Sequence, residues 1–269
     1  MKVAALQTVS GSTLAGNLDS AARLLAEAVG AGAELAVLPE YFCLMGARET
    51  DKLEVRERFG SGRVQDFLAQ QARSLGLWIV GGTLPLAADD PAHVRNTSLA
   101  FSPQGECVAR YDKIHLFKFD NGREAYDESR VIEAGATLQA FTLPSRDGHA
   151  WRVGLSVCYD LRFPELYRGL AADLLLVPSA FTFTTGQAHW ELLLRARAIE
   201  NLAYVAAPAQ GGRHENGRRT WGHSMLVDPW GAVLAQRSEE GEGVVLAELS
   251  IDHLAQVRQQ LPALGHRVL

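Results

Sequence analysis

The first hundred residues alternate between short apolar runs and longer segments in which apolar side chains recur at helical spacing. Residues 2–7, 35–38 and 77–80 are short and rich in aliphatic side chains, which is typical of buried strands. Helical spacing begins after Asn17, a residue type that often caps helices, and returns in residues 63–75. This part of the chain therefore predicts alternating strands and helices, with the first helix capped by Asn17.

Beyond residue 96 the pattern changes to pairs of apolar runs joined by turn sequences. Because hairpins are then mixed with strand–helix alternation, we expect an α/β fold in which two sheets are covered by helices. The chain shows no repeat and no linker, which predicts a single domain over residues 1–269. The expected hairpins are 96–101 with 107–111, 138–143 with 151–157, and 222–227 with 232–236; the expected helices are 164–172, 187–202 and 251–260; the remaining strands are 173–177, 204–207 and 244–249.

Two segments have no clear period. Residues 114–133 are mixed and highly charged, and we predict a long irregular loop there, of the kind that is often functional. Residues 210–219 are basic and rich in glycine, and we predict a second loop.

Composition narrows the class of protein. The chain has 269 residues, of which 47% are hydrophobic and 21% are charged, as in ordinary globular proteins. A net charge of -5 gives no reason to expect nucleic acid or an anionic membrane as a partner. No apolar run approaches the roughly 20 residues of a membrane helix, and Gln7 interrupts the first apolar run too early for a signal peptide. We therefore expect a cytoplasmic protein.

The cysteines are few and widely spaced. Their number is odd and their spacing fits no metal site, so we expect neither a disulfide framework nor a bound zinc ion. In a reducing compartment these thiols stay free. We assign Cys43 and Cys107 to the interior, and the third is Cys158.

Cys158 stands at the end of a predicted strand. The apolar run before it stops abruptly, polar residues follow, and Pro164 is a favourable first residue for a helix. A strand that leads through a tight turn into a helix can hold a nucleophile at the rim of a sheet. The alternative is a buried cysteine that acts only as a small apolar side chain. This stretch alone leaves both interpretations open.

Two other polar residues follow strand ends in the same way, Glu40 and Lys113. Ligand sites gather at the carboxyl ends of strands in α/β sheets, so the three side chains are candidates for one acyl-transfer site. Cys158 would attack a carbonyl carbon, and Glu40 would accept and return the proton. Lys113 and the backbone N–H of Tyr159 would stabilise the oxyanion. The alternative is that Glu40 and Lys113 are solvated charges, as most such residues are.

Other cysteine chemistries fit the sequence less well. A phosphatase loop needs an arginine six residues after the cysteine, where this chain has Pro164. A thioredoxin-type site needs a second cysteine three residues away, and none is there. A papain-like site needs a histidine base, and the eight histidines form no recognisable motif. Elimination leaves Glu40 and Lys113 as the best partners for Cys158.

Three sequence blocks resemble the signature of the nitrilase superfamily of carbon–nitrogen hydrolases. They are Leu-Pro-Glu at 38–40, Tyr-Asp-Lys-Ile-His-Leu at 111–116 and Cys-Tyr-Asp-Leu-Arg-Phe-Pro-Glu at 158–165, and they occur in the family's order. The resemblance implies a four-layer αββα sandwich that pairs into a homodimer, a Glu-Lys-Cys triad, and no metal or cofactor. It also implies that Glu128 is the second glutamate of the site, which positions the lysine and the substrate.

The branch of the family is suggested by further segments. Tyr159-Asp160 after the cysteine is similar to the amidase branch, and residues 181–191 resemble the ω-amidases and deaminated-glutathione amidases. Residues 117–124, 209–215 and 221–225 look closer to the latter. The resemblance implies hydrolysis of the γ-amide of deaminated glutathione to 2-oxoglutarate and cysteinylglycine. An ω-amidase for 2-oxoglutaramate or succinamate, and a catalytically silent binding module, remain as alternatives.

The expected partner is a small-molecule amide that carries carboxylates. Arginine binds carboxylates bidentately, so Arg162 is the first candidate ligand; the alternative is a salt bridge to Glu165 or Asp160. We expect Phe183 and Thr185 to line the acyl pocket, unless Phe183 belongs to the core. The arginines of the basic segment either meet a carboxylate of the leaving group or only solvate the loop; these are Arg213, Arg218 and Arg219.

Overall fold

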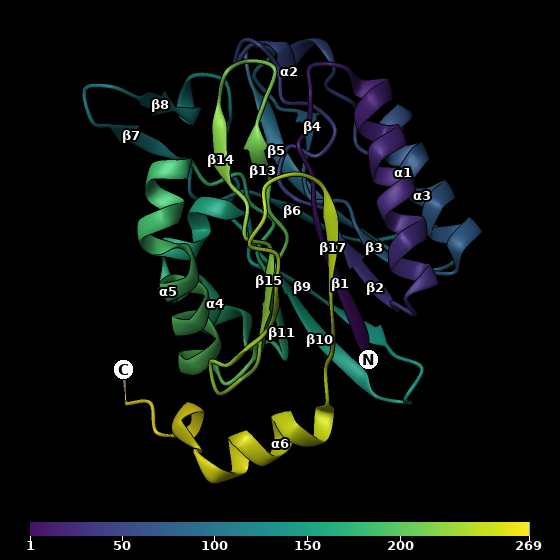
Figure 1. Ribbon diagram of the computed structural model, residues 1–269, viewed down its shortest axis with the longest axis vertical. Coiled ribbons are helices and arrows are strands. Elements are labelled where there is room, and N and C mark those ends of the chain that lie inside the picture. Colours follow the sequence, from purple (N-terminus) through teal and green to yellow (C-terminus); the bar gives the residue numbers. More distant parts are fainter. Residues whose placement is uncertain (269) are drawn as a thin grey trace.

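The computed structural model describes residues 1–268, which form two large β-sheets that lie face to face (Figure 1). The first sheet has the order β17-β1-β2-β3-β5-β4, with β6 also paired to β5. In it β1, β2 and β3 are parallel, and the other pairs are antiparallel. Its strands are β1 (Lys2–Gln7), β2 (Leu35–Val37), β3 (Trp78–Val80), β4 (Leu84–Ala87), β5 (Val94–Phe101), β6 (Cys107–Asp112) and β17 (Gly243–Glu248).

The second sheet has the order β16-β15-β12-β11-β10-β9. Its central strands β10, β11 and β12 are parallel, so their carboxyl ends lie at one edge. Its strands are β9 (Gln139–Pro144), β10 (Ala150–Leu155), β11 (Leu174–Leu176), β12 (Tyr204–Ala207), β15 (Met225–Val227) and β16 (Val233–Gln236).

Helices cover the outer face of each sheet. Figure 1 shows α1 (Leu14–Gly30) and α3 (Arg63–Leu75) on one side of the molecule and α4 (Pro164–Leu170) and α5 (Phe183–Asn201) on the other. Helix α6 (Ile251–Gln260) follows β17 at one end, and α2 (Asp51–Glu54) is a single turn. The layers therefore follow the order helix, sheet, sheet, helix, and the predicted αββα sandwich is confirmed.

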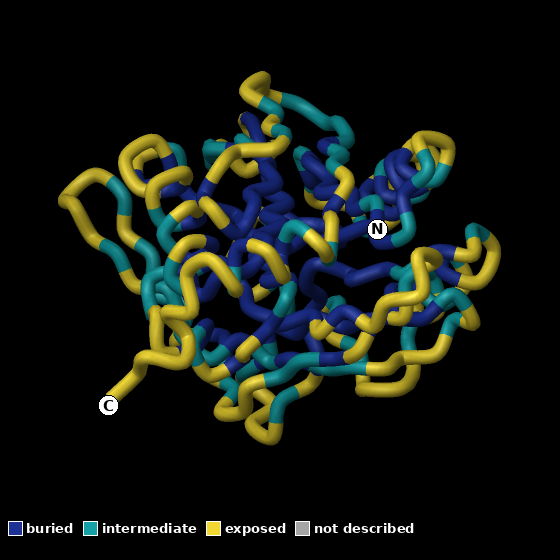
Figure 2. Tube along the Cα trace, turned by 90° about the horizontal axis from the view of Figure 1, so that it is seen from below, coloured by how far each residue is buried: buried dark blue, intermediate teal, exposed yellow. Residues whose placement is uncertain are grey.

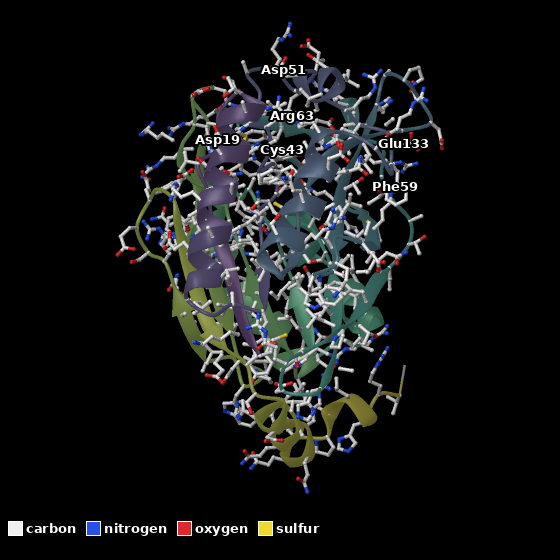
Figure 3. All side chains as sticks on the ribbon, turned by 90° about the vertical axis from the view of Figure 1, so that its right-hand side faces the viewer. Asp19, Cys43, Asp51, Phe59, Arg63 and Glu133 are labelled. Atoms are coloured by element: carbon white, nitrogen blue, oxygen red, sulfur yellow. The ribbon has the colours of Figure 1, made fainter. Side chains whose placement is uncertain are left out.

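The alternation of side chains along β1 explains why both faces of its sheet are buried. Val3 and Ala5 join the cluster that fills the space between the two sheets, whereas Ala4 and Leu6 join the cluster under α1 and α3. Figure 2 shows the buried trace running through the sheets and the exposed trace at the periphery. Figure 3 looks onto α1 and α3, and Cys43 is buried in the cluster beneath them.

Most predicted elements are present, and several boundaries differ. The first helix begins at Leu14 and not after Asn17, because the buried Asn17 side chain bonds to Gly11 and to the Cys43 carbonyl instead of capping the helix. Helix α5 begins at Phe183, four residues before the prediction, because the Thr182 hydroxyl accepts a hydrogen bond from the Thr185 N–H.

Three other predictions need correction. Residues 114–133 contain a small hairpin, β7 (Lys118–Asp120) and β8 (Ala125–Asp127), followed by a 3₁₀ turn. The basic segment also forms a hairpin, β13 (Gly211–Arg213) and β14 (Arg219–Trp221), and is not an irregular loop. Cys107 is exposed at the start of β6, so its assignment to the interior is wrong, whereas Cys43 is buried as predicted.

Among residues 1–268, no helix combines the length and apolar character that a membrane crossing requires.

The backbone at Gly82 leaves no space for a side chain. Gly82 has φ +48°, and a Cβ placed there would lie 2.0 Å from the carbonyl oxygen of Pro39, the residue before Glu40. We expect Gly82→Ala to lower the free energy of unfolding by about 3 kcal/mol, through steric overlap and left-handed strain together.

Gly76 is the matched control, because it has φ +59° but a Cβ placed there would have no neighbouring atom within 4 Å. Gly76→Ala should cost only about 1 kcal/mol in urea denaturation. Equal losses for the two variants would contradict the steric explanation.

Candidate active site

A buried lysine lies between two carboxylates. Lys113 follows β6 directly, and its side chain has no solvent exposure. Its Nζ donates to Glu40 Oε1 at 2.9 Å and to Glu128 Oε2 and Oε1 at 2.7 and 3.0 Å. A buried ammonium with these partners is fixed in position and keeps its charge.

Glu40 is held by groups from both sheets. It follows β2 after Leu38 and Pro39, and its Oε1 also accepts a hydrogen bond from Asn96 Nδ2 at 3.0 Å. Its Oε2 accepts from the Ala180 N–H, which belongs to the loop after β11, at 3.0 Å. The carboxylate therefore bridges the two sheets and has little freedom to rotate.

Glu128 is held just as tightly, although it comes from the segment predicted to be a loop. It opens the 3₁₀ turn Glu128–Arg130 after β8. Besides Lys113, its carboxylate accepts from the Tyr41 hydroxyl at 2.6 Å and from the Phe117 N–H at 2.7 Å. Tyr41, with φ +59°, stands directly after Glu40, so one turn carries one carboxylate and supplies a hydrogen-bond donor to the other.

The ion pairs overcome the cost of burial. Burial lowers the pKa of Lys113, but the charges of Glu128 and Glu40 outweigh it and raise this pKa above its ordinary value. Burial alone would raise the pKa of Glu128, and the Lys113 charge and its hydrogen bonds lower it overall. Both groups are therefore ionised at neutral pH.

Cys158 occupies a strained turn after β10. It opens the 3₁₀ turn Cys158–Arg162 with φ +49°, a value that is uncommon outside glycine. The Cys158 N–H donates to the Pro178 carbonyl at 3.0 Å, which ties the turn to the end of β11. The predicted passage from strand through tight turn to helix is present, since α4 begins at Pro164.

The buried Asp160 side chain holds this turn from within. Its carboxylate accepts hydrogen bonds from the Val157 N–H at 2.8 Å, the Tyr111 hydroxyl at 2.7 Å and the His115 N–H at 3.1 Å. Tyr111 and His115 flank Lys113 in the sequence. Asp160 therefore connects the turn that carries Cys158 with the segment that carries Lys113.

The Cys158 thiol is protonated at neutral pH. Burial raises its pKa well above the ordinary value, the Glu40 charge raises it further, and the Lys113 charge lowers it only in part. A thiol in this state is a weak nucleophile until a base accepts its proton.

These groups surround one pocket. Glu40, Glu128 and the Cys158 thiol meet there although each follows a strand of a different sheet. The lining residues are Glu40, Phe117, Glu128, Cys158, Tyr159, Arg162, Ala180, Phe181, Thr182, Thr185 and Arg218.

Of the predicted substrate ligands, Arg162 and Thr185 line this pocket and Phe183 does not. The Phe183 ring packs edge-on against Trp221 with centroids 5.1 Å apart, and the Arg219 guanidinium covers it at 3.7 Å. Phe181 takes the place in the pocket that we expected for Phe183, because the helix begins four residues earlier than predicted.

Arg162 does not form the salt bridge that was the alternative to a role in substrate binding. Among residues 1–268 it pairs with neither Glu165 nor Asp160 within 4.0 Å. Its guanidinium lies over the Phe181 ring at 5.5 Å, with Nη1 3.3 Å from His189 Nδ1.

Sequence reasoning missed several residues of the site. Tyr41 and Asn96 bind the carboxylates, and Phe117 contributes a backbone donor and part of the pocket wall. The position of Tyr41 directly after Glu40 was an available signal. Asn96 lies 56 positions from its partner and carries no local pattern that would reveal the contact.

Within residues 1–268, no group of three or more His, Cys, Asp and Glu side chains is arranged to hold a metal ion.

Comparison with known proteins places the chain in a family. Residues 2–259 match the carbon-nitrogen hydrolase family, and the chain belongs to it. It is 44% identical over 270 residues to a deaminated glutathione amidase of Synechocystis, covering 98% of this chain and 97% of the relative. It is 35% identical over 265 residues to the omega-amidase NIT2-A of Xenopus laevis, covering 97% of this chain and 92% of the relative.

Solved structures agree with the fold. The structure of the NitFhit protein of Caenorhabditis elegans is similar with a TM-score of 0.89 and 37% identity. The match covers 99% of this chain and 65% of that one, so this chain spans about two thirds of that longer protein. The class of protein is thus a hydrolase of carbon–nitrogen bonds, and its relatives act on amides.

The ion cluster makes stability depend on pH through Glu128. We expect Glu128→Gln to lower the free energy of unfolding by about 3 kcal/mol at pH 7, because Lys113 keeps only one of its two carboxylates. The folded-state pKa of Glu128 is lowered, so its contribution is complete above the ordinary value of 4.5 and is lost as pH falls below that value.

Urea denaturation between pH 3 and 7 measures this effect. The difference between wild type and Glu128→Gln should shrink as the pH falls, whereas Glu191→Gln, which removes an exposed partner of Arg195, should cost less than about 1 kcal/mol throughout. A difference that is constant with pH would contradict an ionised Glu128.

Proposed function

We propose that the chain hydrolyses a linear amide through a thioester on Cys158. The observation that carries the proposal is the placement of the buried Cys158 thiol in one pocket with Glu40 and Glu128, which share the Lys113 ammonium. A thiol that burial keeps protonated needs a base close by, and Glu40 is the carboxylate that lines the same pocket and raises its pKa.

The proposed reaction has two halves. Glu40 takes the Sγ proton as the sulfur attacks the carbonyl carbon, and Lys113 with the Tyr159 N–H stabilises the oxyanion. The C–N bond then breaks, and Glu40 gives the proton to the leaving nitrogen. In the second half Glu40 removes a proton from water, which attacks the thioester, releases the acid and returns the thiol. Glu128 keeps Lys113 charged and in position throughout.

The proposed substrate is deaminated glutathione, with 2-oxoglutarate and cysteinylglycine as products. The name of the Synechocystis relative supports this choice, and so does the Arg162 guanidinium in the pocket, which suits a carboxylate of the acyl part. The second candidate is an ω-amidase for 2-oxoglutaramate, which the Xenopus relative favours. A catalytically silent binding module is the third candidate, and the complete set of Glu40, Lys113 and Cys158 argues against it.

One substrate panel separates these candidates. We expect kcat/KM to be higher for deaminated glutathione than for 2-oxoglutaramate and succinamate. The reverse order would identify an ω-amidase, and no turnover of any linear amide by folded protein would favour the binding module.

Loss of the thiol tests the mechanism in the same assay. Cys158→Ala and Cys158→Ser should lower kcat by at least ~10³-fold, because no nucleophile of equal reactivity remains. Circular dichroism should show an unchanged fold, and Cys43→Ser serves as the control thiol outside the pocket. Full turnover by folded Cys158→Ala would rule the mechanism out.

The proposed assembly is a homodimer of single-domain chains in the cytoplasm. Large apolar side chains are exposed on α5 and on the turn after β15: Leu192 is 71% exposed and Trp230 is 59% exposed. Arg195 Nε donates to the Gly231 carbonyl at 2.8 Å, so helix and turn present one continuous surface. Large exposed apolar side chains on neighbouring elements are typical of interaction sites.

Introducing a charge at this surface tests the dimer. We expect wild type to sediment as a dimer and Leu192→Asp to shift the equilibrium to monomer, because a buried charge without a partner opposes association. Val108→Asp, an equally simple change at an exposed position of β6, should leave the dimer intact. Monomeric wild-type protein at micromolar concentration would contradict the proposal.

A further inference from the structure

The Arg218 guanidinium, like that of Arg162, lacks a carboxylate partner among residues 1–268. Arg218 lines the pocket, and Nη2 donates to the Ala180 carbonyl at 3.0 Å. Its Nε is buried and has no hydrogen-bond acceptor among residues 1–268. Within the same residues no carboxylate approaches the guanidinium within 4.0 Å, and Glu40 and Glu49 act on it only from farther away. A buried donor without an acceptor is costly unless a partner binds it.

Arg218 is held rigidly at the tip of the β13–β14 hairpin. Its N–H donates to Asn216 Oδ1 at 3.0 Å, and its carbonyl accepts from the His214 N–H at 2.9 Å. The buried His214 ring lies 2.9 Å from the Ser10 carbonyl and 2.8 Å from Thr220 Oγ1. The Tyr126 ring lies 5.1 Å from the guanidinium. Little conformational freedom would therefore be lost when a ligand binds.

The neighbouring arginines of the hairpin differ from it. Arg219 already pairs with Glu240 at 2.6 Å and covers the Phe183 ring. Arg213 is exposed and does not line the pocket. Arg218 alone among these three lines the pocket.

The charges of the pocket favour an anion. Arg162 and Arg218 line it, and Lys113 neutralises only one of the two carboxylates, Glu40 and Glu128. With the thiol protonated, cations outnumber carboxylates by one before substrate binds. A substrate with one carboxylate can engage only one of the two guanidiniums in a bidentate manner.

We propose that Arg218 binds a carboxylate on the leaving-group side of the scissile amide, while Arg162 binds the carboxylate of the acyl part. The site then selects amides that carry a carboxylate on each side of the bond. This inference rests on the proposed amide hydrolysis. Deaminated glutathione has both carboxylates, the second being that of its glycine, whereas 2-oxoglutaramate has one only.

A pair of substrates with the same scissile bond tests whether Arg218 binds a carboxylate of the leaving group. Deaminated glutathione is compared with its glycinamide analogue, in which a neutral carboxamide replaces the glycine carboxylate. We expect wild type to prefer the acid by ~10-fold or more in kcat/KM, mainly through KM, as the loss of a charge-assisted hydrogen bond predicts.

Arg218→Ala should lower this preference to less than about twofold, because the acid loses its partner and the amide loses nothing. Arg218→Lys should retain part of the preference through its charge. Arg213→Ala, on the same hairpin but outside the pocket, should retain all of it.

Two results would overturn the inference. One is a wild-type enzyme that hydrolyses both substrates equally well. This result does not depend on whether any variant folds. The other is an Arg218→Ala enzyme that keeps the full preference for the acid, even if it is slower on both substrates. Failure of folded wild type to hydrolyse either substrate would contradict the proposed function itself, so the two failures are distinguishable.

Discussion

The site depends on one buried ammonium shared by two carboxylates. Lys113 joins Glu40, which follows β2, to Glu128, which lies in the excursion after β6. Water has little access to these three side chains, so the groups fix one another. Lys113 keeps its charge although it is buried because both carboxylates bind it. Two backbone features shape the turn that carries Glu40 and so help to position its carboxylate. They are the left-handed conformation of Tyr41 and the close approach of Gly82 to Pro39.

The second sheet supplies the reactive group. The Cys158 turn lies at the carboxyl end of β10, and the Ala180 N–H next to it bonds to Glu40 across the boundary between the sheets. Asp160 adds a further link by binding Tyr111 and His115 on either side of Lys113. The face-to-face packing of two sheets is therefore a condition for the site, because neither sheet carries the full set of groups.

Two sheets covered by helices, and the three polar residues at strand ends, could be predicted from the sequence. Both predictions depend on the order of apolar and polar residues within short segments. The apolar runs before Glu40, Lys113 and Cys158 are visible without any structure. The hydrogen bonds from Asn96 and Ala180 to Glu40 join residues that are 56 and 140 positions apart in the sequence. No local sequence pattern predicts contacts over such separations. Phe183 was misassigned for a related reason, since the Thr182 cap moves the start of α5 and leaves Phe181 in the pocket.

The covalent step is tested most directly by mass spectrometry of enzyme quenched in acid during turnover. The mechanism predicts that the peptide containing Cys158 gains the mass of the substrate's acyl part without the leaving amine, and that Cys158→Ala gains no such adduct. An acyl group mapped to a different residue, or steady turnover by a protein that lacks this thiol, would contradict it.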